Sequence, residues 1–264
     1  MQLDPGITEA LTGIVRFLER ENIRYVVFGA LCPMILIDAK DPGGRGFGAR
    51  ETKDVDMLVE VDDWNHYHRI LDMLEENGFK RTGTEHRLTW KGRQVDLIPY
   101  GKSLIDEDRL VWPESGNRMD VSGFEAIFEK AETVLLPDTD GLQVRMIPLP
   151  LSLYTKVIAY LDRQFPRDLL DITHILLHYE EIGFSERRYN EEIPADMEYE
   201  MRGAYLLGYD LKSLLSREKR ARMAPFFELA EQEYLPAVRE SLMFYRLSEA
   251  EWRHLIRTLR KGMD

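Results

Sequence analysis

Hydrophobic and polar positions follow two different periods in the first half of the chain. Apolar side chains recur at the three- and four-residue spacing of an amphipathic helix in residues 7–18 and Trp64–Glu76, and the apolar stretch Leu31–Ala39 is a further helix candidate. Strand-like runs alternate with these helices, namely Tyr25–Phe28, Thr52–Val61, Arg87–Trp90, Gln94–Pro99, Thr133–Leu136 and Leu142–Ile147. The turn at residues 91–93 predicts that two of the strands form a hairpin. We therefore expect a small mixed sheet flanked by helices.

After Pro150 the pattern is helical almost to the last residue. The expected helices are Ser152–Asp162, Asp168–Tyr179, Met197–Ser216, Pro225–Tyr245 and Ser248–Lys261. Two Ser-x-x-Glu capping boxes, Ser122 with Glu125 and Ser248 with Glu251, predict helix starts. The change of character predicts an α+β protein with an α/β domain over residues 1–149 and a helical domain over residues 150–264.

Composition and charge limit the class of protein, its partners and its location in the cell. The 264 residues are 44% hydrophobic and carry a net charge of −12, which is typical of a folded protein rather than a disordered one. The net negative charge argues against extensive binding of nucleic acid over the whole surface. Any contact with RNA therefore needs a local basic patch such as residues 217–222, where four of six residues are basic. The single cysteine, Cys32, excludes an internal disulfide and a cysteine-based zinc cluster. No apolar run is long enough to span a membrane and the first residues do not form a signal peptide, so we expect a cytoplasmic protein with no membrane partner.

Three aspartates in the predicted strands form the candidate chemistry. Asp54 and Asp56 are two residues apart, so both side chains leave the same face of their strand, about 6 to 7 Å apart. Two like charges side by side repel each other unless a cation compensates them. Asp96 lies in another strand that pairs plausibly beside the first, and such carboxylates hold Mg²⁺ that also binds nucleotide phosphates. The alternative is that all three are solvated surface acids, with Asp96 paired to Arg93.

Residues suited to phosphate binding precede these aspartates in the sequence. Gly29 ends a strand just before a helix, where the backbone N–H groups of the helix start are accessible to phosphate. Arg50 and Lys53 add positive charge just before Asp54. We therefore expect a nucleotide triphosphate to bind beside the metal.

These motifs resemble the nucleotidyltransferase superfamily of the DNA polymerase beta type, and in particular its bacterial branch of AbiEii-like toxins. The matching positions are a glycine turn after a strand, an Arg-x-Thr-x-Asp-x-Asp motif, a third Asp on a later strand and a Lys…Arg…Arg-Asp…Asp stretch between helices. In this chain they are Phe28-Gly29-Ala30, Arg50-Glu51-Thr52-Lys53-Asp54-Val55-Asp56, Val95-Asp96-Leu97, and Lys156 with Arg163, Arg167, Asp168 and Asp171. The resemblance covers roughly Tyr25 to Ile172.

The resemblance implies an enzyme that moves a nucleoside monophosphate from an NTP to an acceptor hydroxyl and releases pyrophosphate. It assigns Asp54, Asp56 and Asp96 as catalytic residues that bind Mg²⁺ or Mn²⁺, and it assigns nucleotide binding to Gly29, Ala30, Arg50, Thr52 and Lys156. Arg163, Arg167, Asp168 and Asp171 are either supporting residues of the site or a salt-bridge network between helices. A tRNA or other RNA is the expected acceptor and a cognate antitoxin the expected partner, as in a toxin–antitoxin pair.

Two other functions stay open at the level of sequence. A transferase of this kind also acts on a protein or on a small molecule such as an aminoglycoside. The chain is alternatively a catalytically silent nucleotide-binding protein, because Ala30 replaces the usual Gly or Ser and because residues 41–50, with four glycines and a proline, form an insertion that we expect to be a mobile loop.

Overall fold

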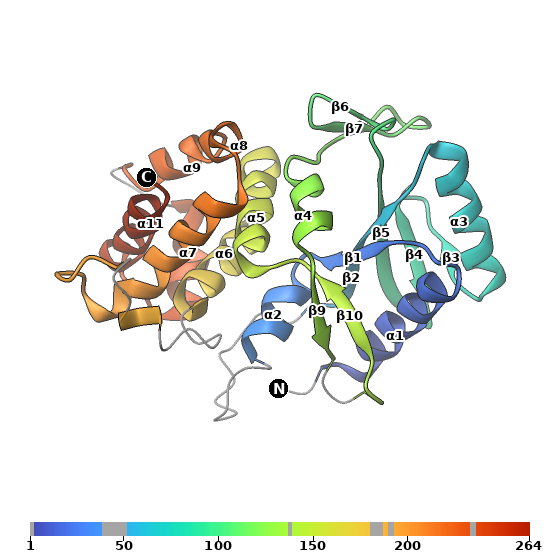
Figure 1. Cartoon of the computed structure of the whole chain (residues 1–264), viewed down its shortest axis with the longest axis horizontal. Helices are drawn as coiled ribbons and strands as arrows, with labels where there is room; N and C mark the ends of the chain where they lie inside the picture. The colour runs from blue at the N-terminus through green and yellow to red at the C-terminus, as the bar shows by residue number, and fades with distance from the viewer. Residues whose placement is uncertain (1–2, 39–51, 137–138, 180–186, 190–192, 233–235) are drawn as a thin grey trace. The chain divides into compact units, whose positions relative to one another are not determined.

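The computed structural model describes residues 3–38, 52–136, 139–179, 187–189, 193–232 and 236–264 (Figure 1). Contacts within the chain divide it into two compact units. The first contains Met1–Cys32 and Glu51–Pro148, and the second contains Pro33–Arg50 and Leu149–Asp264. The domain boundary at residue 149 stays a prediction. The insertion expected at residues 41–50 lies outside the described residues.

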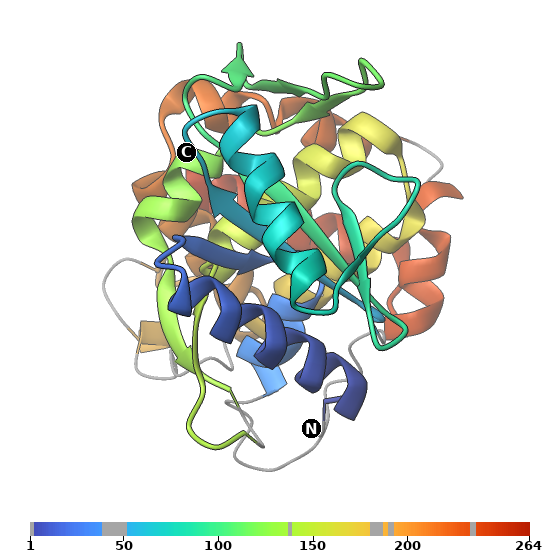
Figure 2. The same ribbon diagram turned by 90° about the vertical axis from the view of Figure 1, so that its right-hand side faces the viewer.

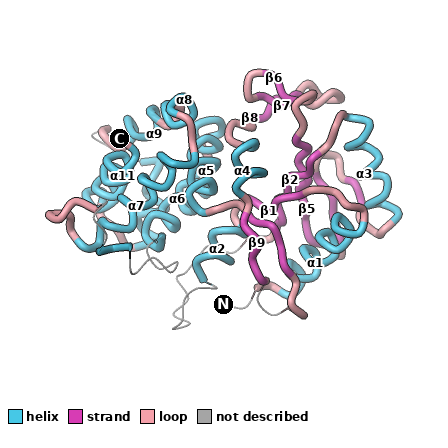
Figure 3. The backbone as a smooth tube through the Cα atoms, viewed as in Figure 1, coloured by secondary structure: helices cyan, strands magenta, loops and turns pink. Residues whose placement is uncertain are grey.

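A seven-stranded sheet forms the centre of the first unit (Figure 3). Its order is β3-β4-β5-β2-β1-β10-β9, with β2 paired in parallel to β5, β1 paired in parallel to β10 and the other neighbours antiparallel. The strands are β1 (Tyr25–Phe28), β2 (Asp54–Glu60), β3 (Lys80–Arg81), β4 (Arg87–Trp90), β5 (Arg93–Tyr100), β9 (Glu132–Leu135) and β10 (Gln143–Met146). The expected mixed sheet and its hairpin are confirmed.

Helices cover both faces of this sheet. On one face lie α1 (Pro5–Arg20) and α3 (Trp64–Glu76), in front of the strands in Figure 2, whereas α4 (Phe124–Lys130) lies on the other face (Figure 1). An aspartate caps each of the first two helices, because the Asp4 side chain accepts from the Ile7 N–H and the Asp63 side chain accepts from the His66 N–H. The hydrophobic stripe of α1 is buried, as its helical period predicts.

Two local features of the first unit differ from the sequence-based expectation. A second sheet of three short strands, β6 (Ile105–Asp106), β7 (Arg109–Val111) and β8 (Arg118–Asp120), was not predicted because two- and three-residue strands are too short to show a period. The capping box at Ser122 is wrong. Gly123 in a left-handed conformation (φ 89°) precedes α4 instead, no side chain caps this helix, and Ser122 is buried.

The second unit contains helices throughout its described part from residue 149 onward. Its α-helices are α5 (Leu149–Arg163), α6 (Pro166–His178), α7 (Arg202–Leu214), α8 (Arg217–Ala221), α9 (Ala224–Leu229), α10 (Arg239–Tyr245) and α11 (Glu249–Met263), with short 3₁₀ turns η2 (Arg187–Tyr189), η3 (Tyr199–Met201) and η4 (Pro236–Val238). The apolar helix α2 (Leu31–Asp38) begins at the end of the first unit, and its residues from Pro33 are counted with the second.

One expected helix of the second unit is wrong as a single element. Residues Pro225–Tyr245 contain α9, η4 and α10 as separate pieces. The helix α9 ends at Leu229, and Pro236, which has no N–H to donate, begins η4. The expected helix Met197–Ser216 is shorter, beginning as the turn η3 before α7. The second capping box is confirmed, since Ser248 and Glu251 bond reciprocally at the start of α11.

The core of the second unit lies between α6, α7 and α11. Trp252 of α11 is fully buried, and its indole N–H donates to the Thr173 hydroxyl of α6 at 3.2 Å. The helices α7 and α11 meet at two glycines, Gly208 and Gly262. A Cβ at Gly208 would lie 2.1 Å from the Leu259 carbonyl oxygen, so the two backbones touch directly.

No helix in the described part of the chain is long and apolar enough to cross a membrane.

Candidate active site

The strand β2 brings the predicted aspartates onto one face of the sheet. Asp54 and Asp56 are both half-buried and alternate with the fully buried Val55 and Met57. In the parallel pairing of β2 with β5, Asp56 lies directly opposite Asp96. Paired residues of neighbouring strands project to the same face, so the three carboxylates share one face at the junction of two strands. The structure thus brings together the three aspartates named from the sequence.

A turn between β1 and α2 adjoins this group. Phe28, the last residue of β1, pairs with Asp56, and Gly29 follows it with a φ of +76°. A Cβ at Gly29 would lie 1.9 Å from the Asp56 Oδ2, so both the backbone conformation and the available space require glycine at this position. Ala30 is buried in the same turn. The backbone therefore approaches the Asp56 carboxylate closely.

Polar neighbours fix two of the three carboxylates. The Thr52 hydroxyl, which is buried, donates a hydrogen bond to Asp54 Oδ1. Asp96 is only 7% exposed, and the Arg87 guanidinium donates to both of its oxygens, from Nε to Oδ1 at 2.7 Å and from Nη2 to Oδ2 at 2.7 Å. This two-fold geometry is the strongest that an arginine makes with a carboxylate.

The Arg87 guanidinium interacts electrostatically with all three aspartates. Its hydrogen bond to Asp96 raises the pKa of the guanidinium, and the charges of Asp96, Asp54 and Asp56 act in the same direction. The neighbouring His86 lies with its Nε2 3.9 Å from Asp96 Oδ2, and burial lowers the pKa of its imidazole. Arg87 thus supplies the site with a positive charge that was not predicted from the sequence.

The hairpin register could have identified Arg87. A two-residue turn that pairs Trp90 with Arg93 also pairs Arg87 with Asp96. The alternative that Asp96 pairs with Arg93 is wrong, because Asp96 pairs with Arg87 and Arg93 pairs with Asp4 at 2.8 Å. Adjacent cross-strand residues, and not the nearest residues in sequence, decide which charges meet.

Of the remaining predicted residues, Arg50 is outside the described part of the chain and the others belong to the second unit. Lys156 of α5 is buried in the second unit, with its Nζ 2.7 Å from Asp171 Oδ2 and 3.7 Å from Asp168 Oδ1 of α6. Arg163 donates two hydrogen bonds to Asp168, at 2.8 and 2.6 Å. These four residues form an ion-pair network between two helices.

Arg167 stands apart from that network. Its guanidinium lies 5.3 Å from the centre of the Phe165 ring. Its role as a supporting residue of the site stays a prediction.

The aspartate group is chemically suited to a magnesium ion. Mg²⁺ prefers oxygen ligands and is commonly bound through one or two carboxylates together with substrate phosphates. Asp54 and Asp56 provide the two carboxylates. In the described part of the chain no three His, Cys, Asp or Glu side chains converge closely enough to hold a metal by themselves. The protein's carboxylates therefore fit a metal that completes its coordination with phosphate oxygens.

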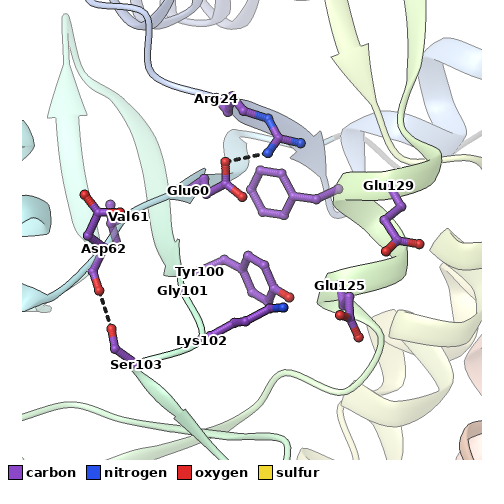
Figure 4. Close-up of a pocket in the computed structure, with 11 residues that line it drawn as sticks. Arg24, Glu60, Val61, Asp62, Tyr100, Gly101, Lys102, Ser103, Glu125 and Glu129 are labelled. Atoms are coloured by element: carbon purple, nitrogen blue, oxygen red, sulfur yellow. Dashed lines mark hydrogen bonds and ion pairs between the residues drawn. The ribbon is translucent and has the colours of Figure 1, made fainter.

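A cavity of about 530 Å³ lies at the opposite end of the same two strands (Figure 4). Glu60 and Tyr100, which end β2 and β5, line it, and Glu60 forms an ion pair with Arg24 at 2.6 Å. The Tyr100 ring stacks on Phe128 with 5.0 Å between the ring centres. Six residues of strand, roughly 20 Å, separate Glu60 from Asp54, so this cavity is distinct from the aspartate group.

The Asp-x-Asp strand, the glycine turn and the third aspartate on a parallel neighbour form the arrangement that the resemblance to nucleotidyltransferases predicts. The family model described as "Nucleotidyl transferase AbiEii toxin, Type IV TA system" matches residues 44–262. The chain therefore belongs to the AbiEii nucleotidyl transferase toxin family, and the resemblance seen in the sequence is confirmed.

Solved structures with some likeness to the chain include the following three proteins. An antigenic nucleotidyltransferase-like protein from Paracoccidioides brasiliensis has 15% identity and a TM-score of 0.42, over 70% of this chain and 88% of that one. The antibiotic-resistance factor ANT(2'')-Ia has 12% identity and a TM-score of 0.36, over 84% and 92%. The CdnE cyclic dinucleotide synthase of Elizabethkingia meningoseptica has 10% identity and a TM-score of 0.31, over 98% and 92%. No curated protein matches the sequence.

Proposed function

We propose that this nucleotidyltransferase moves a nucleoside monophosphate from an NTP to a hydroxyl group of RNA, with tRNA as the foremost acceptor. The observation that carries the proposal is the shared face of Asp54, Asp56 and Asp96 at the junction of two parallel strands. Family membership supports a toxin whose activity a cognate antitoxin restrains.

Asp54 and Asp56 are the proposed ligands of Mg²⁺ or Mn²⁺. A bound divalent cation neutralises charge on the triphosphate and on the departing pyrophosphate. Thr52 orients Asp54 through its hydroxyl group, and the turn at Gly29 and Ala30, which packs closely against Asp56, is the proposed phosphate-binding turn. Arg50 and Lys156 are the proposed further contacts to the triphosphate.

Asp96 is the proposed acceptor of the proton from the attacking hydroxyl. In the transfer, the hydroxyl oxygen forms a bond to the α-phosphorus, the bond from that phosphorus to the bridging oxygen breaks, and pyrophosphate leaves with the electron pair. Arg87 holds both Asp96 oxygens and so fixes the orientation of the carboxylate. Each Asp96 oxygen accepts one hydrogen bond from Arg87 and keeps a second lone pair that can take the proton.

The first test incubates the protein with Mg²⁺, each α-labelled NTP in turn and total cellular RNA, and then follows the label. We expect label on RNA, and we expect Asp56→Asn to lower the rate at least about a hundredfold because it removes a charge needed to hold the metal. The exposed Asp196, replaced by Asn, is the matched control and leaves the rate unchanged. An Asp56→Asn protein with full activity would contradict the proposal.

A catalytically silent nucleotide-binding protein is the second candidate. The observation favouring it is that Arg87 occupies both oxygens of Asp96, beside the buried Ala30 where the resemblance expects Gly or Ser. Metal-dependent NTP binding without pyrophosphate release supports this candidate. Label on a polypeptide or on an added aminoglycoside would instead identify a different acceptor.

A further inference from the structure

A pocket lined by arginines lies in the second unit, apart from every residue assigned above. It has a volume of about 460 Å³ and is formed by the end of α11 together with α8 and α9, which lie together near the C-terminus (Figure 1). Arg217 and Arg220 come from α8 and Arg260 comes from α11, whereas Asp264 is the acidic residue of the lining. Three guanidinium groups and one aspartate make this a local positive site in a chain of net charge −12.

Two of these guanidinium groups are held in place by the protein. Arg220 Nη1 donates to the Met263 carbonyl oxygen at 2.6 Å, and the Arg260 guanidinium lies 5.8 Å from the centre of the buried Phe227 ring. The Nε of Arg220 is buried and has no hydrogen-bond partner in the described part of the chain. The cations are therefore arranged before any ligand binds, which reduces the entropy lost on binding.

The neighbouring arginines of α11 are neutralised, but those of the pocket are not. Arg257 pairs with Glu231 at 2.7 Å and Arg253 pairs with Glu249 at 3.4 Å. Within the described ranges, Arg217, Arg220 and Arg260 form no ion pair with a carboxylate side chain, and Arg217 and Arg260 are exposed. Unpaired, exposed and partly fixed guanidinium groups are suited to bind an anion.

We propose that this pocket binds the backbone phosphates of an RNA chain. Arginine binds phosphate oxygens in a two-fold geometry, and each phosphate that is neutralised releases a counterion, so several arginines together give a strong gain in affinity. Ala221, Ala224 and Phe227 add an apolar wall beside the arginines, and the volume suits a small unit such as one nucleotide. The choice of RNA as the ligand rests on the proposed transfer to RNA.

Fluorescence anisotropy with a short fluorescein-labelled oligouridylate tests the proposal. The full chain is titrated in EDTA without NTP, over a series of NaCl concentrations. We expect Arg217→Gln and Arg260→Gln each to weaken binding about 3- to 10-fold and to reduce the slope of log affinity against log salt by about 0.7 per lost phosphate contact. The control Arg239→Gln removes an exposed arginine of α10 outside the pocket and leaves affinity and slope unchanged. Circular dichroism establishes that each variant is folded.

Three results overturn the proposal. They are equal affinity of the wild type and both pocket variants, equal affinity for an oligomer of the same bases with an uncharged backbone, and arginine-dependent binding of free ATP by a protein that does not bind the oligouridylate. The assay needs neither metal nor NTP, so Asp56→Asn binds the oligouridylate as the wild type does. Arginine-dependent binding without any label transfer refutes the proposed function alone, whereas transfer with arginine-independent binding refutes this inference alone.

Discussion

At the scale of single residues, the Arg87 guanidinium fixes the geometry of the aspartate group. Because both Asp96 oxygens accept from one planar group, the carboxylate has a defined orientation beside Asp56. A lysine at position 87 would keep the positive charge but lose the two parallel hydrogen bonds. Charge and orientation are therefore separable by substitution.

We expect Arg87→Lys to lower the transfer rate about 10- to 100-fold, because Asp96, the proposed proton acceptor, loses the two hydrogen bonds that orient it. Arg87→Met should lower the rate further, and it should lower the Mg²⁺ concentration needed for half-maximal activity because it removes a positive charge that acts on Asp54 and Asp56. Rates measured over a Mg²⁺ series check both expectations. Arg93→Met is the control, because Arg93 lies on the same hairpin as Arg87 but pairs with Asp4. Wild-type rates for Arg87→Met would show that the guanidinium does not position Asp96.

The Gly29 position permits a second test at this scale. Gly29→Ala places a Cβ against the Asp56 carboxylate in a left-handed backbone, so we expect it to abolish most of the transfer activity and to lower the free energy of unfolding by about 1–3 kcal/mol. Gly116→Ala is a matched control because Gly116 also has a left-handed φ, of 71°, but no atom near its Cβ. It carries the backbone strain alone and should leave transfer intact. Equal activity of the two variants would contradict the crowding at Asp56.

His174 predicts how the stability of the protein depends on pH. Both of its ring nitrogens are buried without a partner in the described residues, and burial lowers the pKa of the imidazole to about 3. The unfolded chain binds a proton near pH 6.5 whereas the folded one does not, so the free energy of unfolding falls as the pH drops from 6.5 toward 3, by up to about 1.4 kcal/mol per pH unit from this residue.

Chemical denaturation at several pH values, on the wild type and on His174→Leu, measures this contribution. The variant should lose that part of the pH dependence, while the exposed His254→Asn control should keep it. Identical pH profiles for the wild type and His174→Leu would show that His174 is protonated in the folded protein.

At the scale of elements, close backbone contact between α7 and α11 outweighs helix propensity. Gly208→Ala would stabilise an isolated helix by about 1 kcal/mol, yet here the added Cβ would meet the Leu259 carbonyl oxygen at 2.1 Å. We expect a net loss of about 1–3 kcal/mol in the free energy of unfolding, measured by thermal or urea denaturation. Gly13→Ala in α1 is the control, since its nearest contact is the Trp90 ring at 3.3 Å. A stabilised Gly208→Ala protein would show that the two helices separate easily.

Elements with a clear hydrophobic period were predictable from the sequence, and elements decided by a single residue were not. The strands β1 and β2 and the helix α3 follow from their periods, as does the hairpin of β4 and β5. The end of α9 at Leu229 falls within a helical sequence pattern, and the start of α4 is set by the left-handed Gly123. Periodicity reports which face is buried, but it does not report where a backbone must turn.

At the scale of the whole molecule, the sequence predicted the three aspartates but not the partners of the charged residues. Asp54 and Asp56 are close in sequence, so strand geometry alone places them together. The alignment of Asp96 with Asp56, and of Lys156 with Asp171, depends on the register of strands and on the packing of helices that are distant in sequence. A single sequence contains no direct signal for those distances.

The order of the sheet has a consequence for the synthesis of the protein on the ribosome. The aspartate-bearing strands β2 and β5 are both complete by Tyr100, but β10, which covers the other edge of β1, begins only at Gln143. At roughly 5–20 residues per second, the roughly 40 intervening positions take about 2 to 9 s to translate. During that interval the nascent chain carries its aspartates but has an open edge at β1 and lacks the helical second unit. A toxin built in this order therefore acquires its complete sheet late in translation.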